Sequence, residues 1–427
     1  MHLGGSYWRF WAASGLSNIA DGIFGLSIAL VALDITRSPI LISGLDLAAQ
    51  LPWLLFALIA GALADRLDRR RVLFWVDILR VAVLAVLVLA SLADHRSIGI
   101  LYVAALVMGV GETLYDTSAQ SIVPSVVARD DLERANGRMQ GIEIVSNYFV
   151  GPPLGGLLVG VSSVLAFSTG SAIYLIAALF VLSVRGAFRP ERAGPPTTIR
   201  TDIVEGLRYL RDQPVLRRLG LITGGRMFTF TAVSAVLPIY AVAPGPMKLS
   251  AGGFGFFIAS TAIGAVISSL VGERTVARLG AARCLKLTML AFAVTELSPL
   301  AVNPFAVGAL WMVGTYFVII WNVITLSTRQ RIVPERLLGR VNSVYRLVSL
   351  GAMPLGAAAG GVFAQLTSPR LTFVVCGAAT VLLALATLPI TDASLAGPEE
   401  PPPADLTDEP GGPADLAGAA DPRSVTE

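Results

Sequence analysis

Long apolar runs separated by charge clusters constrain the fold of this 427-residue chain more than any other feature. A helix needs about 20 mostly apolar residues to cross a bilayer. Only 14% of the residues are charged, whereas soluble domains contain roughly 25%. The sequence therefore predicts an all-α polytopic membrane protein. We place twelve transmembrane helices at residues 8–33, 41–64, 72–93, 98–124, 137–161, 164–184, 217–242, 250–271, 284–302, 305–333, 340–364 and 369–390.

Basic residues are concentrated on one side of this predicted membrane. That side contains 24 Lys and Arg residues, and the other side contains only Arg37, Arg96, Lys248 and Arg370. Loops rich in Lys and Arg remain in the cytoplasm. We therefore expect a multi-pass protein of the cell membrane, embedded in its lipid bilayer, with both termini in the cytoplasm.

The apolar runs fall into two sets of six. The sequence QSIVP at 120–124 recurs as QRIVP at 330–334, at matching points of the fourth and tenth runs. Two six-helix repeats around a central cavity are typical of secondary transporters. Within the polar stretch between the sets, residues 202–212 suit either an amphipathic helix at the membrane surface or a solvated linker. The predicted segments are an N-terminal bundle (1–184), a linker (185–216), a C-terminal bundle (217–390) and a disordered, acidic, Pro-rich tail (391–427).

The residue inventory excludes several function classes. The two lysines, Lys248 and Lys286, each follow an apolar residue, whereas a P-loop requires Gly-Lys-Ser/Thr. A gradient-driven carrier, or one served by a separate ATPase subunit, therefore remains. Cys284 and Cys376 form no metal-ligand pattern, and the two histidines are far apart in the sequence. We expect no enzyme activity, no cofactor, no metal and no nucleic-acid partner.

Three stretches of the sequence resemble the major facilitator superfamily. GALADRLDRRRV at 61–72 resembles its loop signature G-x-L-x-D-R-x-G-R-R, except that Asp68 stands where the pattern has glycine. GPPLGG at 151–156 resembles the Gly-Pro-x-x-Gly-Gly core of exporting, antiporter-type members, without the upstream glycines. GVGETLYDTSAQSIVP at 109–124, together with residues 205–219, resembles the branch of enterobactin-exporter-like and macrolide-efflux-like proteins.

The resemblance implies a set of gating residues. In the loop signature, charge-assisted bonds between the aspartate and the arginines would close the inner face. A plain positive-inside cluster is the alternative. Asp77 and Arg80, one to two turns from the same membrane face, are interpreted as part of this clamp. The glycines around Pro152 suit close helix packing and a bend, or ordinary tight packing. The predicted gating residues are Gly61, Asp65, Arg66, Arg69, Arg70, Asp77, Arg80, Gly151, Pro152, Gly155 and Gly156.

Charges deep in the apolar runs need a partner or a purpose, because each costs about 2.5–3.5 kcal/mol to insert. Glu112 and Asp116 share one helix face, and in a poorly hydrated cavity they could hold a single proton. Asp21 or Arg226 on a facing helix would bias its release. The alternative is that both acids neutralise arginines of the inner gate. We assign proton coupling to these four residues. Many proton-coupled exporters of the superfamily carry an arginine at the position of Ala105, which leaves the coupling ion open.

By resemblance, the first, fourth, seventh and tenth helices line the substrate cavity. We expect a monomeric secondary transporter, driven by proton antiport, that exports small amphiphilic molecules such as antibiotics or siderophores. A lysophospholipid carrier, an importer of the same fold and a transport-dead membrane sensor remain as alternatives. The predicted lining residues are Asn18, Phe24, Tyr115, Phe228, Trp321, Asn322 and Thr325.

Overall fold

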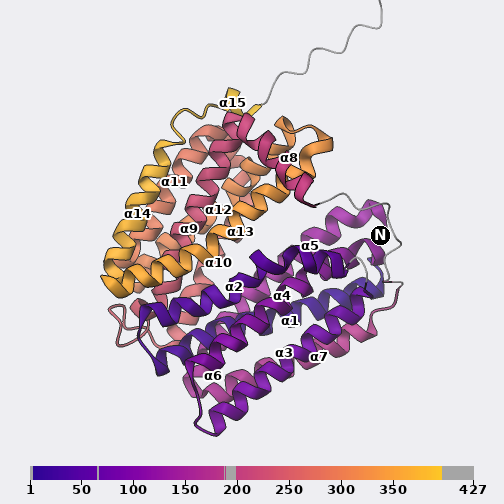
Figure 1. Ribbon diagram of the computed structural model, residues 1–427, viewed down its shortest axis with the longest axis vertical. Coiled ribbons are helices and arrows are strands. Elements are labelled where there is room, and N and C mark those ends of the chain that lie inside the picture. The colour runs from indigo at the N-terminus through magenta and orange to yellow at the C-terminus, as the bar shows by residue number, and fades with distance from the viewer. Residues whose placement is uncertain (1–2, 65–66, 187, 189–198, 397–427) are drawn as a thin grey trace, which may run out of the picture.

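The computed structural model describes residues 3–64, 67–186, 188 and 199–396 (Figure 1). Helices account for nearly all of these residues, and the β-structure among them is one isolated bridge between Val242 and Leu249. The all-α prediction is confirmed. Eleven helical segments in the described part of the chain are long and apolar enough to span a membrane, and α14, where the twelfth was predicted, has 17 residues.

The helices follow the predicted apolar runs to within several residues. The first group, which we call the first bundle, contains α1 (Gly5–Ile35), α2 (Pro39–Ala64), α3 (Arg69–Leu92), α4 (Ile98–Val126), α5 (Leu132–Ile144), the π-helix η2 (Val145–Val150), α6 (Gly151–Val161) and α7 (Ser163–Ser183). The second bundle contains α9 (Pro214–Ala241), α10 (Ala251–Leu279), α11 (Ala281–Leu297), α12 (Pro304–Ile332), α13 (Glu335–Leu366) and α14 (Pro369–Leu385).

Serine and asparagine side chains begin five of these helices. Ser97, Ser162, Ser250 and Ser368 each accept a hydrogen bond from the backbone amide three residues later, at the starts of α4, α7, α10 and α14. Asn303 caps α12 in the same way. Such N-caps satisfy amides that have no partner inside the helix, so the chain can reverse direction in short loops.

The two bundles meet along two pairs of helices, α2 with α13 and α6 with α10. In Figure 1 the ribbons converge where α1 passes into α2, and they diverge toward the end that carries α8 (Ile199–Asp212) and the N-terminus. We call this second end the basic end, because the described loops that the sequence analysis placed on the basic side lie there. The other end is called the opposite end.

Hydrogen bonds join the bundles at the opposite end. The Arg37 guanidinium, in the turn between α1 and α2, donates to the carbonyl oxygens of Val242 and Ala243 at 3.1 and 2.6 Å. The Ser38 hydroxyl donates to Gln365 Oε1 at 2.7 Å. These bonds hold the end of α1 against the ends of α9 and α13.

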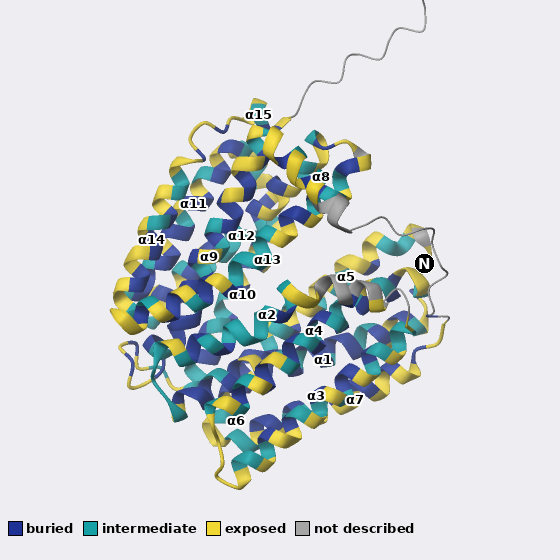
Figure 2. Cartoon of the chain, in the orientation of Figure 1, coloured by how far each residue is buried: buried dark blue, intermediate teal, exposed yellow. Residues whose placement is uncertain are grey.

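Burial follows a simple pattern in both bundles. Buried residues face the interior of each bundle, and large apolar residues cover its outer faces (Figure 2). Trp75, Leu89, Leu270 and Leu382 are among these exposed apolar residues. Apolar surface of this extent is unusual on a soluble protein, and it suits contact with lipid chains.

A π-helical turn interrupts the fifth predicted span, which the sequence presents as one continuous run. The amide of Gly151 donates to the carbonyl of Ser146, five residues earlier, at the end of η2. Pro152 and Pro153 follow, and neither has an amide hydrogen to donate to the preceding turn. A π-turn before them is a common way to accommodate lost i→i−4 bonds.

Residues 199–212 of the predicted linker form the helix α8, and Tyr209 anchors it by donating to the carbonyl of Ile332 at 2.9 Å. The structure also corrects one prediction. The tail was predicted to be disordered from residue 391, yet Asp392–Ala396 form the helix α15. An Asp392 carboxylate oxygen accepts the amide of Ala282 at 2.8 Å, and Leu395 is buried. The remaining tail, 397–427, lies outside the described residues.

Candidate functional site

A cluster of polar side chains occupies the interior of the first bundle. Arg80 on α3 lies 3.2 Å from Asp21 on α1, and Tyr174 on α7 donates to the same Asp21 oxygen at 2.7 Å. Arg80 also donates to Ser17 at 2.9 Å and lies 3.4 Å from Asp77. The cluster therefore connects three helices through one guanidinium.

Two aromatic rings stabilise this guanidinium further. Its carbon atom lies 5.1 Å from the ring centres of Tyr115 and of Tyr174. A cation over an aromatic face is attracted by the ring quadrupole, more strongly when water is excluded. With an exposed fraction of 1%, the Arg80 side chain is held by the two acids, Ser17 and these rings.

This placement corrects the interpretation of Asp77 and Arg80 as part of a clamp near the loop arginines. Arg80 lies eleven residues into α3, which is about 16 Å along the helix. At that depth its partners are Asp21 and Ser17 on α1. The pairing could not be predicted from spacing, because it depends on which helices are neighbours.

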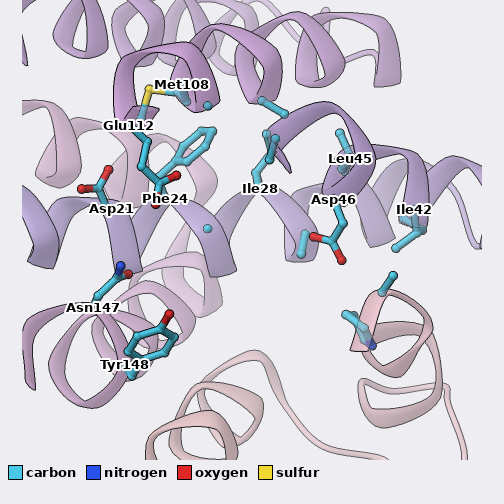
Figure 3. Close-up of a pocket in the computed structure, with 17 residues that line it drawn as sticks. Asp21, Phe24, Ile28, Ile42, Leu45, Asp46, Met108, Glu112, Asn147 and Tyr148 are labelled. Carbon is cyan, nitrogen blue, oxygen red and sulfur yellow. The ribbon is translucent and has the colours of Figure 1, made fainter. Parts of the chain in front are cut away.

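A cavity of ≈ 270 Å³ lies beside this cluster, between α1, α2, α4, η2 and α9 (Figure 3). Asp21 and Glu112 lie together on one side of Ile28, and Asp46 on α2 lies on its other side. Glu112 and Asp46 have no hydrogen bond or salt bridge within the described part of the chain. The other labelled lining residues are Phe24, Ile42, Leu45, Met108, Asn147 and Tyr148.

Glu112 and Asp116 differ in position although they share a helix face. Glu112 lines the cavity, whereas Asp116, one turn nearer the basic end, does not. The charges that act on Asp116 include those of Glu143 on α5 and Arg346 on α13. Of this predicted pair, only Glu112 therefore faces the cavity.

A second buried charge cluster lies in the second bundle. Glu296 on α11 accepts hydrogen bonds from Thr229 at 2.7 Å and from Thr380 at 2.6 Å. The Arg226 guanidinium lies 4.6 Å from the Phe292 ring and interacts electrostatically with Glu296. Arg226 therefore has its own acid in the second bundle, which corrects the expectation that it acts on the acids of the first.

The two clusters occupy corresponding helices. Asp21 and Tyr174 lie on the first and sixth spans of the first bundle, and Arg226 and Thr380 lie on the first and sixth spans of the second. Arg226 follows Asp21 by 205 residues, and Thr380 follows Tyr174 by 206. The third span of each bundle supplies the opposite charge, from Arg80 on α3 and Glu296 on α11. The acid therefore lies on the first span in the first bundle and on the third span in the second bundle.

The predicted cavity-lining residues mostly lie elsewhere. Phe24 lines the cavity, whereas Asn18 donates to the carbonyl of Ser14 and Tyr115 packs against Arg80. Trp321 is buried in the second bundle, where it donates to Thr223 at 3.2 Å. The remaining three are likewise not among the lining residues of this cavity: Phe228 and Asn322 are exposed, and Thr325 donates to the carbonyl of Trp321.

Two acids were missed by the sequence interpretation. Asp46 and Glu296 each stand inside a predicted apolar run, so the signal that selected Asp21 was also present for them. Asp46 faces the cavity, and Glu296 interacts electrostatically with Arg226. Both belong with the candidate functional residues.

The loop signature is only partly described. Asp65 and Arg66 lie outside the described residues, and for Gly61 only its place in α2 is described. Arg69 donates to the carbonyl of Ser121 at 2.8 Å and Arg70 to that of Val184 at 3.0 Å, so both reach the basic ends of neighbouring helices. Asp68 caps α3 by accepting the amide of Arg71, which gives a physical reason for aspartate where the signature has glycine.

The GPPLGG run packs against both bundles. A Cβ atom on Gly151 would lie 2.6 Å from the Cα of Gly22, and one on Gly155 would lie 2.8 Å from the carbonyl oxygen of Ile23, both on α1. On the other side, a Cβ on Gly156 would lie 2.4 Å from the carbonyl oxygen of Ala251 on α10. These glycines allow α6 to touch α1 and α10 at once.

Comparisons with known proteins identify the family of this chain. A family described as "Transmembrane secretion effector" matches residues 5–406. The chain is 29% identical over 353 residues to the multidrug efflux pump Tap of Mycolicibacterium fortuitum, covering 79% of this chain and 84% of that one. It is 23% identical over 387 residues to macrolide efflux protein A of Streptococcus pyogenes, covering 89% and 94%.

A solved structure has the same fold. The bacterial homologue of the iron transporter ferroportin, in its inward-facing state, superimposes with a TM-score of 0.70 over 91% of this chain and 99% of that chain. The sequences are 16% identical, so this likeness concerns the fold alone. It covers both bundles.

Proposed function

Since the chain belongs to the transmembrane secretion effector family of the major facilitator superfamily, we propose that it exports small amphiphilic molecules across the cell membrane. Its relatives with efflux names span most of its length. The observation that carries the proposal is the cavity between the bundles, where apolar side chains surround a few polar ones. Sites for small molecules typically combine these features.

In this proposal the basic end faces the cytoplasm, as the distribution of Lys and Arg favours. The bonds of Arg37 and Ser38 then close the outer side, and the bundles diverge toward the inside (Figure 1). This is an inward-facing arrangement, in which a substrate enters from the cytoplasm. Export requires the opposite closure, which breaks the outer bonds and brings the basic ends together.

We further propose that protons drive the exchange. Asp21 already has a cation, because Arg80 and Tyr174 hold it. Glu112 lines the cavity without a hydrogen bond or salt bridge in the described chain, so a proton is the simplest source of charge compensation for it. Ala105, at the position where many proton-coupled exporters of the superfamily carry an arginine, also lines the cavity. In this chain Arg80 on α3 supplies a buried guanidinium beside the cavity instead.

Export is tested in cells that express the protein, with a broad panel of lipophilic dyes and antibiotics. We expect lower accumulation of some of these compounds, and we expect a protonophore to abolish the difference. Equal accumulation with and without expression across the panel would overturn the export proposal. Export that persists after the proton gradient is dissipated would leave the direction standing and remove proton coupling.

A further inference from the structure

A second cavity, of ≈ 560 Å³, lies between α10 and α12 in the second bundle. The two helices touch at Gly264, where a side chain would overlap the carbonyl oxygen of Met312. The cavity begins beyond this contact and extends toward the basic end, where Leu395 of α15 also lines it. Val323 on its wall is 54% exposed, so the cavity opens to the surface of the bundle. It shares no lining residue with the cavity beside Asp21.

The wall of this second cavity changes from apolar to charged toward the basic end. On α12 it passes from Ile319 and Val323 to Ser327 and then to Arg331, in the last turn of the helix. Twelve residues separate Ile319 from Arg331, which is about 18 Å along a helix. Half of the hydrocarbon core of a bilayer is about 15 Å thick. The cavity therefore has the length and the polarity gradient of one lipid molecule in one leaflet.

Three polar side chains of this cavity lack a partner within the described part of the chain. Ser268 on α10 is 3% exposed, and its hydroxyl makes no hydrogen bond there. Glu273 and Arg331 are exposed, and neither forms a hydrogen bond or a salt bridge there. Buried hydroxyls are nearly always hydrogen-bonded, so Ser268 indicates a bound molecule. The unpaired acid and base indicate that this molecule carries both a positive and a negative group.

We infer that the second cavity binds a phospholipid whose headgroup carries a primary ammonium beside its phosphate. The ammonium would donate to Glu273, and the phosphate would accept from Arg331, both in charge-assisted hydrogen bonds. Ser268 precedes Glu273 by five residues and so lies about 7.5 Å deeper, where its hydroxyl would donate to an ester oxygen of the lipid. An acyl chain would then extend past Val323 to Ile319. This inference does not depend on the proposed export function.

Four probes separate the parts of this ligand. Phosphatidylethanolamine, phosphatidylcholine, diacylglycerol with the same acyl chains and free phosphoethanolamine would each be titrated against the purified full-length protein in detergent, with bound molecules counted by native mass spectrometry. We expect phosphatidylethanolamine to bind most tightly. Phosphatidylcholine should bind at least about tenfold more weakly, because its quaternary ammonium has no N–H to donate, and diacylglycerol should bind more weakly still.

The same titrations can contradict the inference without any variant. Equal binding of phosphatidylethanolamine and phosphatidylcholine, or of phosphatidylethanolamine and diacylglycerol, would overturn recognition of the headgroup. Free phosphoethanolamine that binds as tightly as the lipid would show that the ligand is a soluble zwitterion, and would overturn the lipid assignment.

Variants then assign each group of the lipid to a residue. Glu273→Gln should weaken phosphatidylethanolamine by about tenfold and leave phosphatidylcholine nearly unchanged, whereas Arg331→Gln should weaken both, because both contain a phosphate. Ser268→Ala should weaken both lipids by a smaller factor. Glu133→Gln and Arg278→Gln are the matched controls, because these exposed charges do not line the cavity. Wild-type affinity for phosphatidylethanolamine in Glu273→Gln or Arg331→Gln, or equal losses in the controls, would contradict the assignment.

Discussion

Arg80 on α3 and Asp21 on α1 form a salt bridge at 3.2 Å in the interior of the first bundle, although 59 residues separate them in the sequence. The exposed fractions of the two side chains are 1% and 17%. The pair therefore has one member that is wholly enclosed and one that reaches the cavity. It connects the helix packing of the bundle to the candidate site.

The first prediction concerns Arg80. Arg80→Gln would leave Asp21 and Asp77 buried without a cation, which typically costs about 3–5 kcal/mol. We expect a clear drop in the unfolding temperature of the purified protein, measured by intrinsic fluorescence. Arg71→Gln is the control, because Arg71 is on the same helix and 73% exposed. Similar shifts in the two variants would show that the buried pair contributes little.

The second prediction concerns the acids of α4. Glu112→Gln should abolish substrate-coupled proton movement in reconstituted vesicles while substrate binding persists, because the variant cannot exchange a proton with the cavity. Asp116→Asn, which lies outside the cavity lining, should cause only a partial defect. Normal substrate-coupled proton flux in Glu112→Gln would exclude Glu112 from coupling.

The third prediction concerns the contact between α6 and α10. Gly156→Ala would place a methyl group 2.4 Å from the carbonyl oxygen of Ala251, so the two helices must separate. Because this contact joins the bundles, we expect a large loss of transport at equal membrane abundance. Gly160→Ala, on the same helix with nothing within 4 Å, should transport normally. Full activity in Gly156→Ala would show that a wider separation of α6 and α10 does not affect transport.

The fourth prediction concerns the end of the chain. Removal of residues 397–427 should leave stability and transport unchanged. Truncation after Thr391 also removes the Asp392 bond to Ala282 and the buried Leu395. Loss of a capping bond costs about 1 kcal/mol, and loss of a buried leucine about 1.5–3 kcal/mol, so the unfolding temperature should fall. An equal effect of both truncations would contradict a structural role for α15.

The secondary structure could be predicted from the sequence because each span contains its own signal. Apolar runs of sufficient length, interrupted by charge, define α1 to α4 closely. The start of the C-terminal tail was harder to predict. The acidic tail has a composition typical of disorder, yet Asp392 and Leu395 each have a specific partner. Composition averages over the segment and does not reveal two residues that fit a neighbouring helix.

Several residues of the candidate site could be predicted from the sequence, but the contacts between them could not. Asp21 and Glu112 could be selected because a carboxyl in an apolar run is costly and therefore rare. Their surroundings depend on how the helices pack. Arg80, which contacts Asp21, lies on a helix that was not expected to line the cavity. Trp321 was expected to line the cavity, but it donates a hydrogen bond to Thr223 inside the second bundle. One sequence carries no information on which of several buried polar residues meet.

The bond between Asp392 and Ala282 has a consequence for biosynthesis. The two residues are 110 positions apart, and a ribosome adds about 5–20 residues per second. The start of α11 is therefore made about 5 to 20 seconds before its acceptor exists. During that interval the Ala282 amide lacks the acceptor that it has in the folded protein. The helix α15 thus completes the start of α11, which was made much earlier, so this part of the second bundle reaches its final structure only after residue 392 has been added.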